Sequence, residues 1–127
     1  MDKKIIKTEK APGAIGPYSV GVVANGFVYT AGQVGINPET GKLVEGGIES
    51  ETRQVLNNVK NILEAAGTSM QKVVKTTVFL QDMGEFSKMN GVYAEFFTEN
   101  PPARSAVEVA ALPLGVSVEI EAIALAE

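Results

Sequence analysis

The pattern of apolar and polar positions predicts strands near both ends of the chain and two helices between strands. Runs of β-branched or alternating apolar residues, bounded by turn-forming residues, are typical of strands. Asn25 and Gly26 separate two such runs, and this dipeptide favours the type I′ turn of a β-hairpin. The polar segment 37–47, with its proline and glycines, is predicted to be a loop. The predicted strands occupy both runs within residues 20–32, residues 72–80, 103–110 and 116–125, and a short additional segment near 5–8.

Two segments carry apolar residues at helical spacing. In residues 49–67 the apolar positions recur every three or four residues and stop before Gly67, which suits the left-handed conformation that often ends a helix. A second helix is predicted to open at Asp82, with Glu85 three residues later as its capping partner. Asn100 and the two prolines after it end this segment. The apolar stripe of the second helix consists of Phe86, Met89, Tyr93 and Phe96 or Phe97.

The order of these elements, β-β-α-β-α-β-β, predicts a single α+β domain over residues 1–127. Strand, helix and strand occur twice in succession, and both crossovers are expected to be right-handed. If they step the same way across the sheet, both helices cover one face and leave the other face bare. An apolar face without cover in a small domain is usually buried against copies of the same chain. We therefore expect a homo-oligomer.

Composition narrows the classes of partner and chemistry. The net charge of −4 argues against a nucleic-acid partner, because phosphate binding needs a cationic surface. The 127 residues include neither cysteine nor histidine, so thiolate nucleophiles, imidazole bases and zinc held by sulfur are excluded. The glycine-rich segments GPYSVG and TAGQVG lack the strand–loop–helix context of a dinucleotide site. We expect an enzyme of this composition to use neither metal nor cofactor.

Targeting and membrane signals are not found in the pattern. The first ten residues contain two adjacent isoleucines but no apolar run of signal-peptide length. No window approaches the roughly 20 apolar residues that a membrane-spanning helix needs. The sequence therefore predicts a cytoplasmic protein without a membrane partner.

Arg104 and Glu119 are the charged residues that stand out within the predicted strands. Arg104 is one of only two arginines, and alternation places it on the same strand face as Ala106 and Glu108. A planar guanidinium beside a small residue can bind a carboxylate ligand through two hydrogen bonds. The alternative is a structural ion pair with Glu108 or Glu119. Glu119 itself is either a solvated surface acid or a group that transfers protons.

Several sequence motifs, taken in their order along the chain, resemble those of the RidA/YjgF family of imine deaminases, and the resemblance covers almost the whole chain. The motifs are APGAIGPYS, YTAGQVGINPETG, LNNVKNILEAAG, VVKTTVFLQDM, YAEFF, PPARSAVEVAALP and VEIEAIA. The resemblance implies a chorismate-mutase-like α+β fold, with a mixed sheet and two helices on one face. It also implies a homotrimer in which the sheets form a barrel and the pockets lie between subunits.

The same resemblance implies an activity, namely the hydrolysis of 2-iminobutanoate and 2-iminopropanoate to 2-oxo acids and ammonia. Arg104 would hold the substrate carboxylate, and Glu119 would activate the water. Small 2-imino and 2-oxo acids would be the ligands, with no cofactor and no metal. The residues that the resemblance places around the substrate are Tyr18, Ala31, Gly32, Asn90 and Ala106. Many relatives carry serine in place of Ala31 and cysteine, serine or threonine in place of Ala106, which affects fine specificity.

Other functions use parts of the same residue set. A trimeric, non-catalytic binding protein for 2-oxo acids would need Arg104 but not Glu119. A chorismate mutase on the related fold would need more cationic groups than one strand arginine to bind a dicarboxylate. A ribonuclease fits poorly with an acidic chain that lacks histidine.

Overall fold

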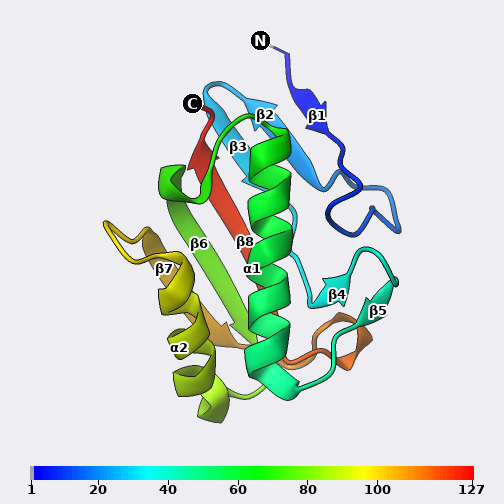
Figure 1. The fold of residues 1–127 in the computed structure, drawn as a ribbon, viewed down its shortest axis with the longest axis vertical. Coiled ribbons are helices and arrows are strands. Elements are labelled where there is room, and N and C mark those ends of the chain that lie inside the picture. Colours follow the sequence, from blue (N-terminus) through cyan, green and yellow to red (C-terminus); the bar gives the residue numbers. More distant parts are fainter. Residues whose placement is uncertain (1) are drawn as a thin grey trace.

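Within residues 2–127, the part that the computed structural model describes, six strands form one mixed sheet in the order β1-β2-β3-β8-β6-β7 (Figure 1). Strand β8 pairs antiparallel with β3 on one side and with β6 on the other, and β7 pairs parallel with β6. The C-terminal strand therefore lies in the middle of the sheet. The strands are β1 (Lys4–Ile6), β2 (Gly21–Ala24), β3 (Phe27–Thr30), β6 (Val73–Leu80), β7 (Ala103–Glu108) and β8 (Val118–Leu125).

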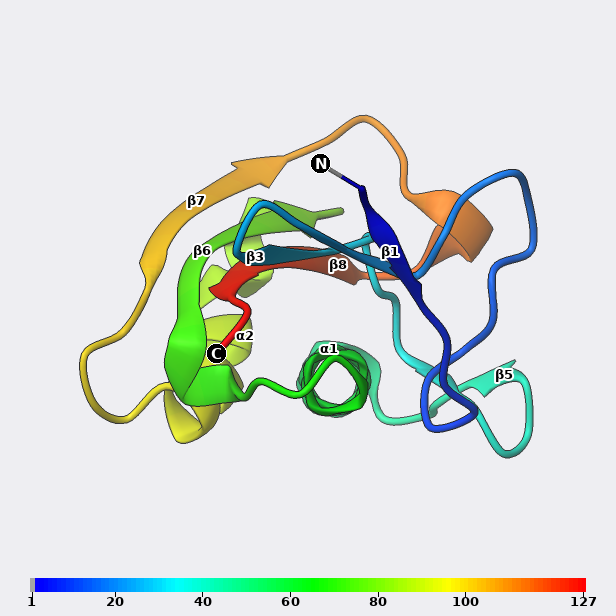
Figure 2. The ribbon, with the colours of Figure 1, turned by 90° about the horizontal axis from the view of Figure 1, so that it is seen from above.

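Both helices lie on the same face of this sheet, as the sequence predicts (Figure 2). Helix α1 (Gly47–Ala65) connects β3 to β6, and helix α2 (Phe86–Phe96) connects β6 to β7. The two connections step in the same direction across the sheet, since β7 lies beyond β6 and β6 lies beyond β3. The sheet is curved, and α1 and α2 lie on its concave side (Figure 2).

The predicted hairpin turn and the predicted end of α1 are confirmed. Asn25 and Gly26 both have positive φ angles, 52° and 85°, as a type I′ turn requires. Gly67 also has a positive φ of 89°, and its N–H donates to the carbonyl of Glu64. The N–H of Thr68 donates to the carbonyl of Leu63, which completes a Schellman motif.

Two local predictions were wrong. The segment predicted as a loop contains β5 (Lys42–Leu43), which pairs with β4 (Ile36–Asn37) in a short two-stranded ribbon. Each of these strands has only two residues and the turn between them is polar, so the pattern of apolar residues gives no strand signal. Asp82 caps a 3₁₀ turn rather than α2, and its Oδ1 accepts a hydrogen bond from the N–H of Gly84 at 2.8 Å. The α-helix begins only at Phe86, because the backbone of Glu85 is not in a helical conformation.

The core lies between the two helices and the covered face of the sheet. Alternate residues of β8 point into it and are almost completely buried, beginning with Val118 and Ile120. Full burial of one such aliphatic side chain contributes about 1.5–3 kcal/mol. The buried residues of the helices include Val55, Leu56, Val59, Ile62 and Leu63 of α1 and Met89, Val92 and Tyr93 of α2.

Within residues 2–127, no helix is both long enough and apolar enough to cross a membrane.

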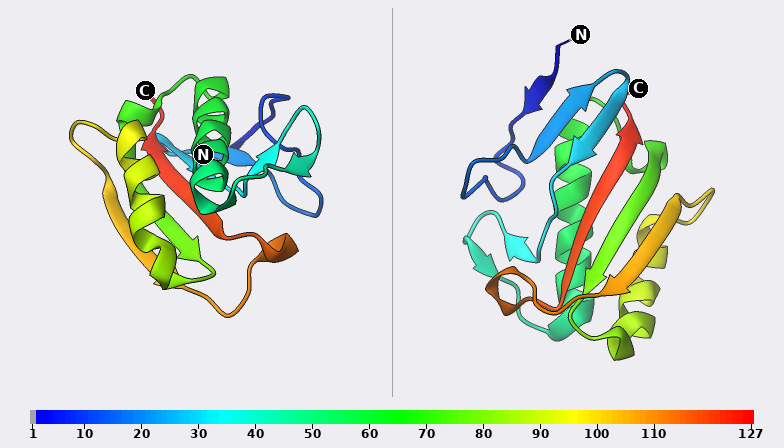
Figure 3. Two further views of the ribbon diagram at one scale, coloured as in Figure 1. Left: turned by 60° about the horizontal axis from the view of Figure 1, so that its bottom comes forward. Right: turned by 180° about the vertical axis from the view of Figure 1, so that it is seen from behind.

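The opposite face of the sheet has no helix on it (Figure 3). Three of its large apolar side chains, Tyr29, Val107 and Leu125, are 40–43% exposed. Their strands, β3, β7 and β8, span the breadth of the sheet from its middle to its edge. An uncovered apolar face is therefore present as predicted, whereas the oligomer expected to cover it stays a prediction.

Two glycines provide a matched test of this packing. A Cβ at Gly21 would lie 2.9 Å from Cγ2 of Ile62, a completely buried side chain of α1. We expect Gly21→Ala to lower the free energy of unfolding by about 1–3 kcal/mol, because the core is overpacked. A Cβ at Gly91, inside α2, would meet no atom within 4 Å. We expect Gly91→Ala to raise stability by about 0.5–1 kcal/mol, since glycine is a poor helix former.

Urea denaturation of both variants and the wild-type protein, at one protein concentration, measures these changes. A Gly21→Ala variant as stable as the wild-type protein would contradict the packing of β2 against α1.

Candidate active site

Glu119 lies on the uncovered face of the sheet, near the start of β8. Its neighbours in the strand, Val118 and Ile120, point the other way and are fully buried in the core. The backbone of Ile120 forms a two-way bridge with Gln33: the Gln33 N–H donates to Ile120 O at 2.8 Å, and the Ile120 N–H donates to Gln33 O at 3.1 Å. This bridge brings the segment that follows β3 alongside the Glu119 side chain.

Gly32 packs directly against the Glu119 carboxyl group. A Cβ on Gly32 would lie 2.8 Å from Cδ of Glu119 and closer still to its Oε2. Any side chain at position 32 would therefore displace the carboxylate. The neighbouring Ala31 is held in place by its N–H, which donates to Val20 O at 2.9 Å. The family resemblance placed Gly32 near the substrate, and the structure adds this steric reason for a glycine at position 32.

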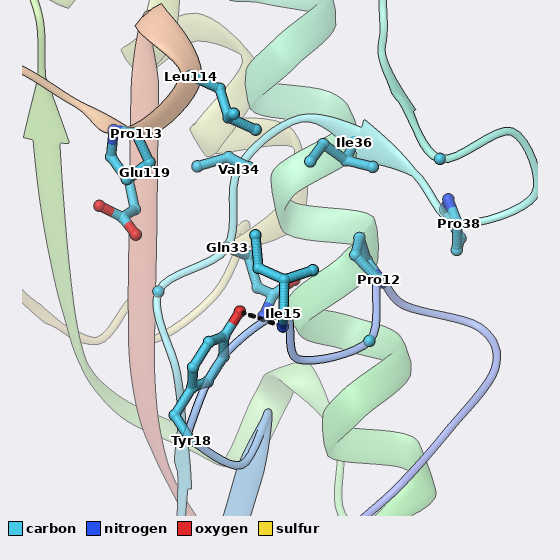
Figure 4. Close-up of a pocket in the computed structure, with 13 residues that line it drawn as sticks. Pro12, Ile15, Tyr18, Gln33, Val34, Ile36, Pro38, Pro113, Leu114 and Glu119 are labelled. Carbon is cyan, nitrogen blue, oxygen red and sulfur yellow. Dashed lines mark hydrogen bonds between the residues drawn. The ribbon is translucent and has the colours of Figure 1, made fainter.

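The Glu119 carboxylate lines a pocket of about 340 Å³ between β8 and three segments, residues 12–18, 32–41 and 113–114 (Figure 4). Tyr18 lines the same pocket and is half-exposed. Ile15 and Leu114 are far more exposed than ordinary apolar residues, at 86% and 69%. The other lining residues are Pro12, Gly13, Gly32, Gln33, Val34, Ile36, Pro38, Gly41 and Pro113. The wall is thus mainly apolar, and no lysine or arginine is among these lining residues.

The environment raises the pKa of Glu119 above its ordinary value of 4.5. The larger cause is partial burial, which removes water from the charged form, and the smaller cause is repulsion by Glu121. A carboxylate with a raised pKa accepts and returns protons more readily near neutral pH. Among residues 2–127, no group of three or more acidic side chains is arranged to hold a metal ion.

Arg104 lies on the opposite, helix-covered face. It is aligned in the parallel β6–β7 register with Thr76, which is buried beneath α2. Its NH1 donates a hydrogen bond of 2.7 Å to Oδ1 of Asn90 on α2. Ala106 lies two residues further along β7, on the same face, and packs against the core.

The interpretation of Arg104 as part of a structural ion pair with Glu108 or Glu119 was wrong. Oε1 of Glu108 accepts a hydrogen bond from the N–H of Met83 at 2.7 Å. Glu119 is separated from Arg104 by the thickness of the sheet. Within residues 2–127, the ion pair found joins Arg53 to Glu95 at 3.0 Å. Arg104 therefore has no carboxylate partner among these residues.

Two residues near Arg104 were missed by sequence reasoning. Cζ of Arg104 lies 5.2 Å from the ring centroid of Phe86 and 4.7 Å from that of Tyr93. Both rings had been assigned only to the apolar stripe of α2. Together with Asn90 they lie at positions i, i+4 and i+7, which share one side of a helix. That spacing was the available signal.

The structure thus places the candidate residues in two groups. One group, on the uncovered face, consists of Glu119, Tyr18 and Gly32, with Ala31 next to Gly32 in the chain. The other, on the covered face, consists of Arg104, Asn90 and Ala106. A single chain does not bring Arg104 and Glu119 together.

Comparison with known proteins gives consistent matches over the same length. The family model described as endoribonuclease L-PSP matches residues 8–126. A RutC family protein from Pyrococcus horikoshii is 57% identical over 98% of this chain and 99% of its own. The human 2-iminobutanoate/2-iminopropanoate deaminase is 49% identical over 97% of this chain and 90% of its own.

Solved structures have the same fold. A crystal structure from Yersinia pestis, described as a protein of unknown function of the conserved Rid family, superposes with a TM-score of 0.95. It is 51% identical and covers 98% of this chain and 99% of its own. The motifs of the sequence, the two helices on one face of a mixed sheet and these matches agree, and the chain belongs to the RidA/YjgF family.

Proposed function

We propose that this protein hydrolyses 2-imino acids, such as 2-iminobutanoate and 2-iminopropanoate, to the corresponding 2-oxo acids and ammonia. The observation that carries the proposal is the position of the Glu119 carboxyl group, which packs against Gly32 in a mainly apolar pocket. Partial burial there raises the pKa of this group. Such a group accelerates the hydrolysis of an imine, because protons must leave the water and reach the departing amine. The name of the human relative supports the same reaction.

The complete site forms between two subunits of a homotrimer. A 2-imino acid carries a carboxylate, and the residues that line the Glu119 pocket include no cation to bind it. Arg104 of the same chain lies on the other face of the sheet and does not reach this pocket. Arg104 of a neighbouring subunit supplies the missing charge. Three copies joined around a threefold axis bury the uncovered sheet faces and give three equivalent sites.

Arg104 binds and orients the substrate. Its guanidinium group presents paired N–H donors that match the two oxygens of a carboxylate. Binding in this way fixes the imine carbon in front of the Glu119 carboxylate and the water next to it. Holding the reacting groups together lowers the entropic cost of the reaction. Tyr18 borders the pocket and limits the space into which substrate and water can move.

Glu119 moves the protons. Water adds to the carbon of the protonated imine while Glu119 accepts one proton from it, which gives a neutral carbinolamine. Glu119 then returns this proton to the amino nitrogen. As the carbon–nitrogen bond breaks, the hydroxyl proton passes to Glu119 and the carbonyl forms. Ammonia leaves and takes up that proton as ammonium, so Glu119 is regenerated as a carboxylate.

The description of the family model as an endoribonuclease is less compatible with this chain. RNA binding draws on a cationic surface, whereas this chain has a net charge of −4 and no histidine.

An assay of 2-oxo acid release tests the proposal. An amino-acid oxidase generates the imine in place, and semicarbazide traps what remains. We expect the wild-type protein to accelerate release over buffer, and Glu119→Gln to lower the rate by about 10²- to 10⁴-fold through loss of proton transfer. Arg104→Ala is expected to lose activity through weaker substrate binding.

The control for Glu119→Gln is Glu64→Gln, which changes an exposed acid on α1 and should leave the rate unchanged. Glu119→Gln should still bind 2-oxobutanoate, since Arg104 is intact. Binding without any acceleration by the wild-type protein would reject the deaminase and favour a binding protein for small carboxylates.

The pH dependence of kcat/KM gives a second test. Glu119 acts as a base in its ionised form, so the rate falls as pH falls through its raised pKa. Glu121→Gln removes one of the two causes of that rise, and the acid limb should therefore move to lower pH. The shift is partial because burial, the larger cause, remains. An acid limb that stays in place or moves to higher pH would exclude Glu119 as the titrating base.

A further inference from the structure

The guanidinium group of Arg104 is surrounded by three side chains that all come from α2. Cζ lies 4.7 Å from the centroid of the Tyr93 ring and 5.2 Å from that of Phe86. NH1 donates to Oδ1 of Asn90 at 2.7 Å. Within residues 2–127, Asn90 is the one hydrogen-bond partner of this guanidinium. Its remaining N–H groups are therefore available to a ligand.

The Tyr93 ring is itself fixed in position. Its hydroxyl group shares a buried hydrogen bond of 2.7 Å with Oγ1 of Thr76, the residue of β6 that is aligned with Arg104. The ring also packs against Phe97, with centroids 4.7 Å apart. Burial raises the pKa of Tyr93, so its hydroxyl stays protonated and neutral beside the cation. The ring, the strand and the arginine thus form one connected unit.

These contacts restrict Arg104 in two ways. Aromatic faces attract a guanidinium and hold it flat against them, more strongly where water is excluded. The amide oxygen of Asn90 sets the rotation of the guanidinium plane by accepting one N–H. An arginine that is already ordered loses less side-chain entropy when a carboxylate binds. The position of α2 therefore controls how well Arg104 is prepared for its ligand.

We propose that Tyr93 and Phe86, together with Asn90, are positioning residues for substrate binding: they form a platform on α2 that orients Arg104 toward the substrate carboxylate. The inference rests on the proposed function for the identity of the ligand. It adds residues that act through Arg104 and do not touch the reacting atoms. Their effect falls on affinity for the carboxylate, and hence on KM, rather than on proton transfer at Glu119.

Two substitutions of Tyr93 separate this role from core packing. Tyr93→Phe removes the hydrogen bond to Thr76 but keeps the ring, so stability falls while carboxylate affinity stays near the wild-type value. Tyr93→Leu removes the ring, so affinity falls as well. Phe86→Leu tests the second ring at a less buried position. Phe96→Leu is the matched control, because Phe96 also belongs to α2 and packs against the core, whereas the cation–π contacts of Arg104 are with Phe86 and Tyr93.

The chain offers a direct spectroscopic readout, because Arg104 and Arg53 are its only arginines. A ¹H–¹⁵N spectrum therefore contains two arginine Nε–H signals. Arg53 is exposed and paired with Glu95, so it serves as the internal reference. We expect the Arg104 signal to be shifted by the two rings in the wild-type protein and in Tyr93→Phe. In Tyr93→Leu it should move toward the position of the Arg53 signal.

Titration with 2-oxobutanoate, followed by the Arg104 signal and by calorimetry, measures the consequence. We expect the Kd to rise about 3- to 30-fold in Tyr93→Leu and in Phe86→Leu, the range that corresponds to loss of a cation–π contact. Tyr93→Phe and Phe96→Leu should bind like the wild-type protein. In an Arg104→Ala background, Tyr93→Leu should cause no further loss of affinity, since the platform acts only through the arginine.

An unchanged Kd in Tyr93→Leu and Phe86→Leu would overturn the inference, as would an equal loss of affinity in Phe96→Leu. So would an Arg104→Ala variant that still binds 2-oxobutanoate with wild-type affinity. Turnover is measured separately on the same proteins. If the ring variants lose affinity as predicted but the wild-type protein hydrolyses no imine, the deaminase is rejected and the platform is retained. If the wild-type protein hydrolyses the imine but the ring variants bind 2-oxobutanoate with wild-type affinity, the platform is rejected and the deaminase is retained.

Discussion

The alternation of side chains across the sheet is the constraint on which the rest of the structure depends. Because successive residues point to opposite faces, burying Val118 and Ile120 under α1 and α2 forces Glu119 onto the uncovered face. The same rule, through the register of β7 with β6, sends Arg104 to the covered face beside α2. A shift of one residue in either strand would exchange these faces and expose the core. The separation of the two charged residues is thus fixed by the packing of the core.

This separation gives meaning to two other features. The uncovered face displays Tyr29, Val107 and Leu125, which are suited to burial against another copy of the chain. The pocket beside Glu119 has apolar walls and an acid but, among its lining residues, no cation. The proposed trimer explains both features, because assembly covers the apolar face and also brings Arg104 of one subunit to Glu119 of another. Each half of the site is then organised by its own chain, Glu119 by Gly32 and Arg104 by α2.

The sequence predicted the elements better than their arrangement. The Asn25–Gly26 turn and the end of α1 at Gly67 depend on local backbone preferences, and both are as predicted. The insertion of β8 between β3 and β6 depends on contacts between distant segments, and periodicity carries no information about it. Arg104 and Glu119 stood out as charges within strands, but their opposite faces followed only from the register of the sheet. The aromatic partners of Arg104 went unnoticed because their apolar spacing also fits a simple core stripe.

The most direct test of a site shared between subunits is complementation between two inactive variants. Chains that carry Arg104→Ala are mixed with chains that carry Glu119→Gln, and exchange of subunits is verified by mass spectrometry. With random mixing of equal amounts, about a quarter of the sites draw Glu119 from one variant and Arg104 from the other, so about a quarter of wild-type activity should return. A mixture of Arg104→Ala chains with chains that carry both substitutions should stay inactive. No recovery in fully exchanged oligomers would contradict a site built from two subunits.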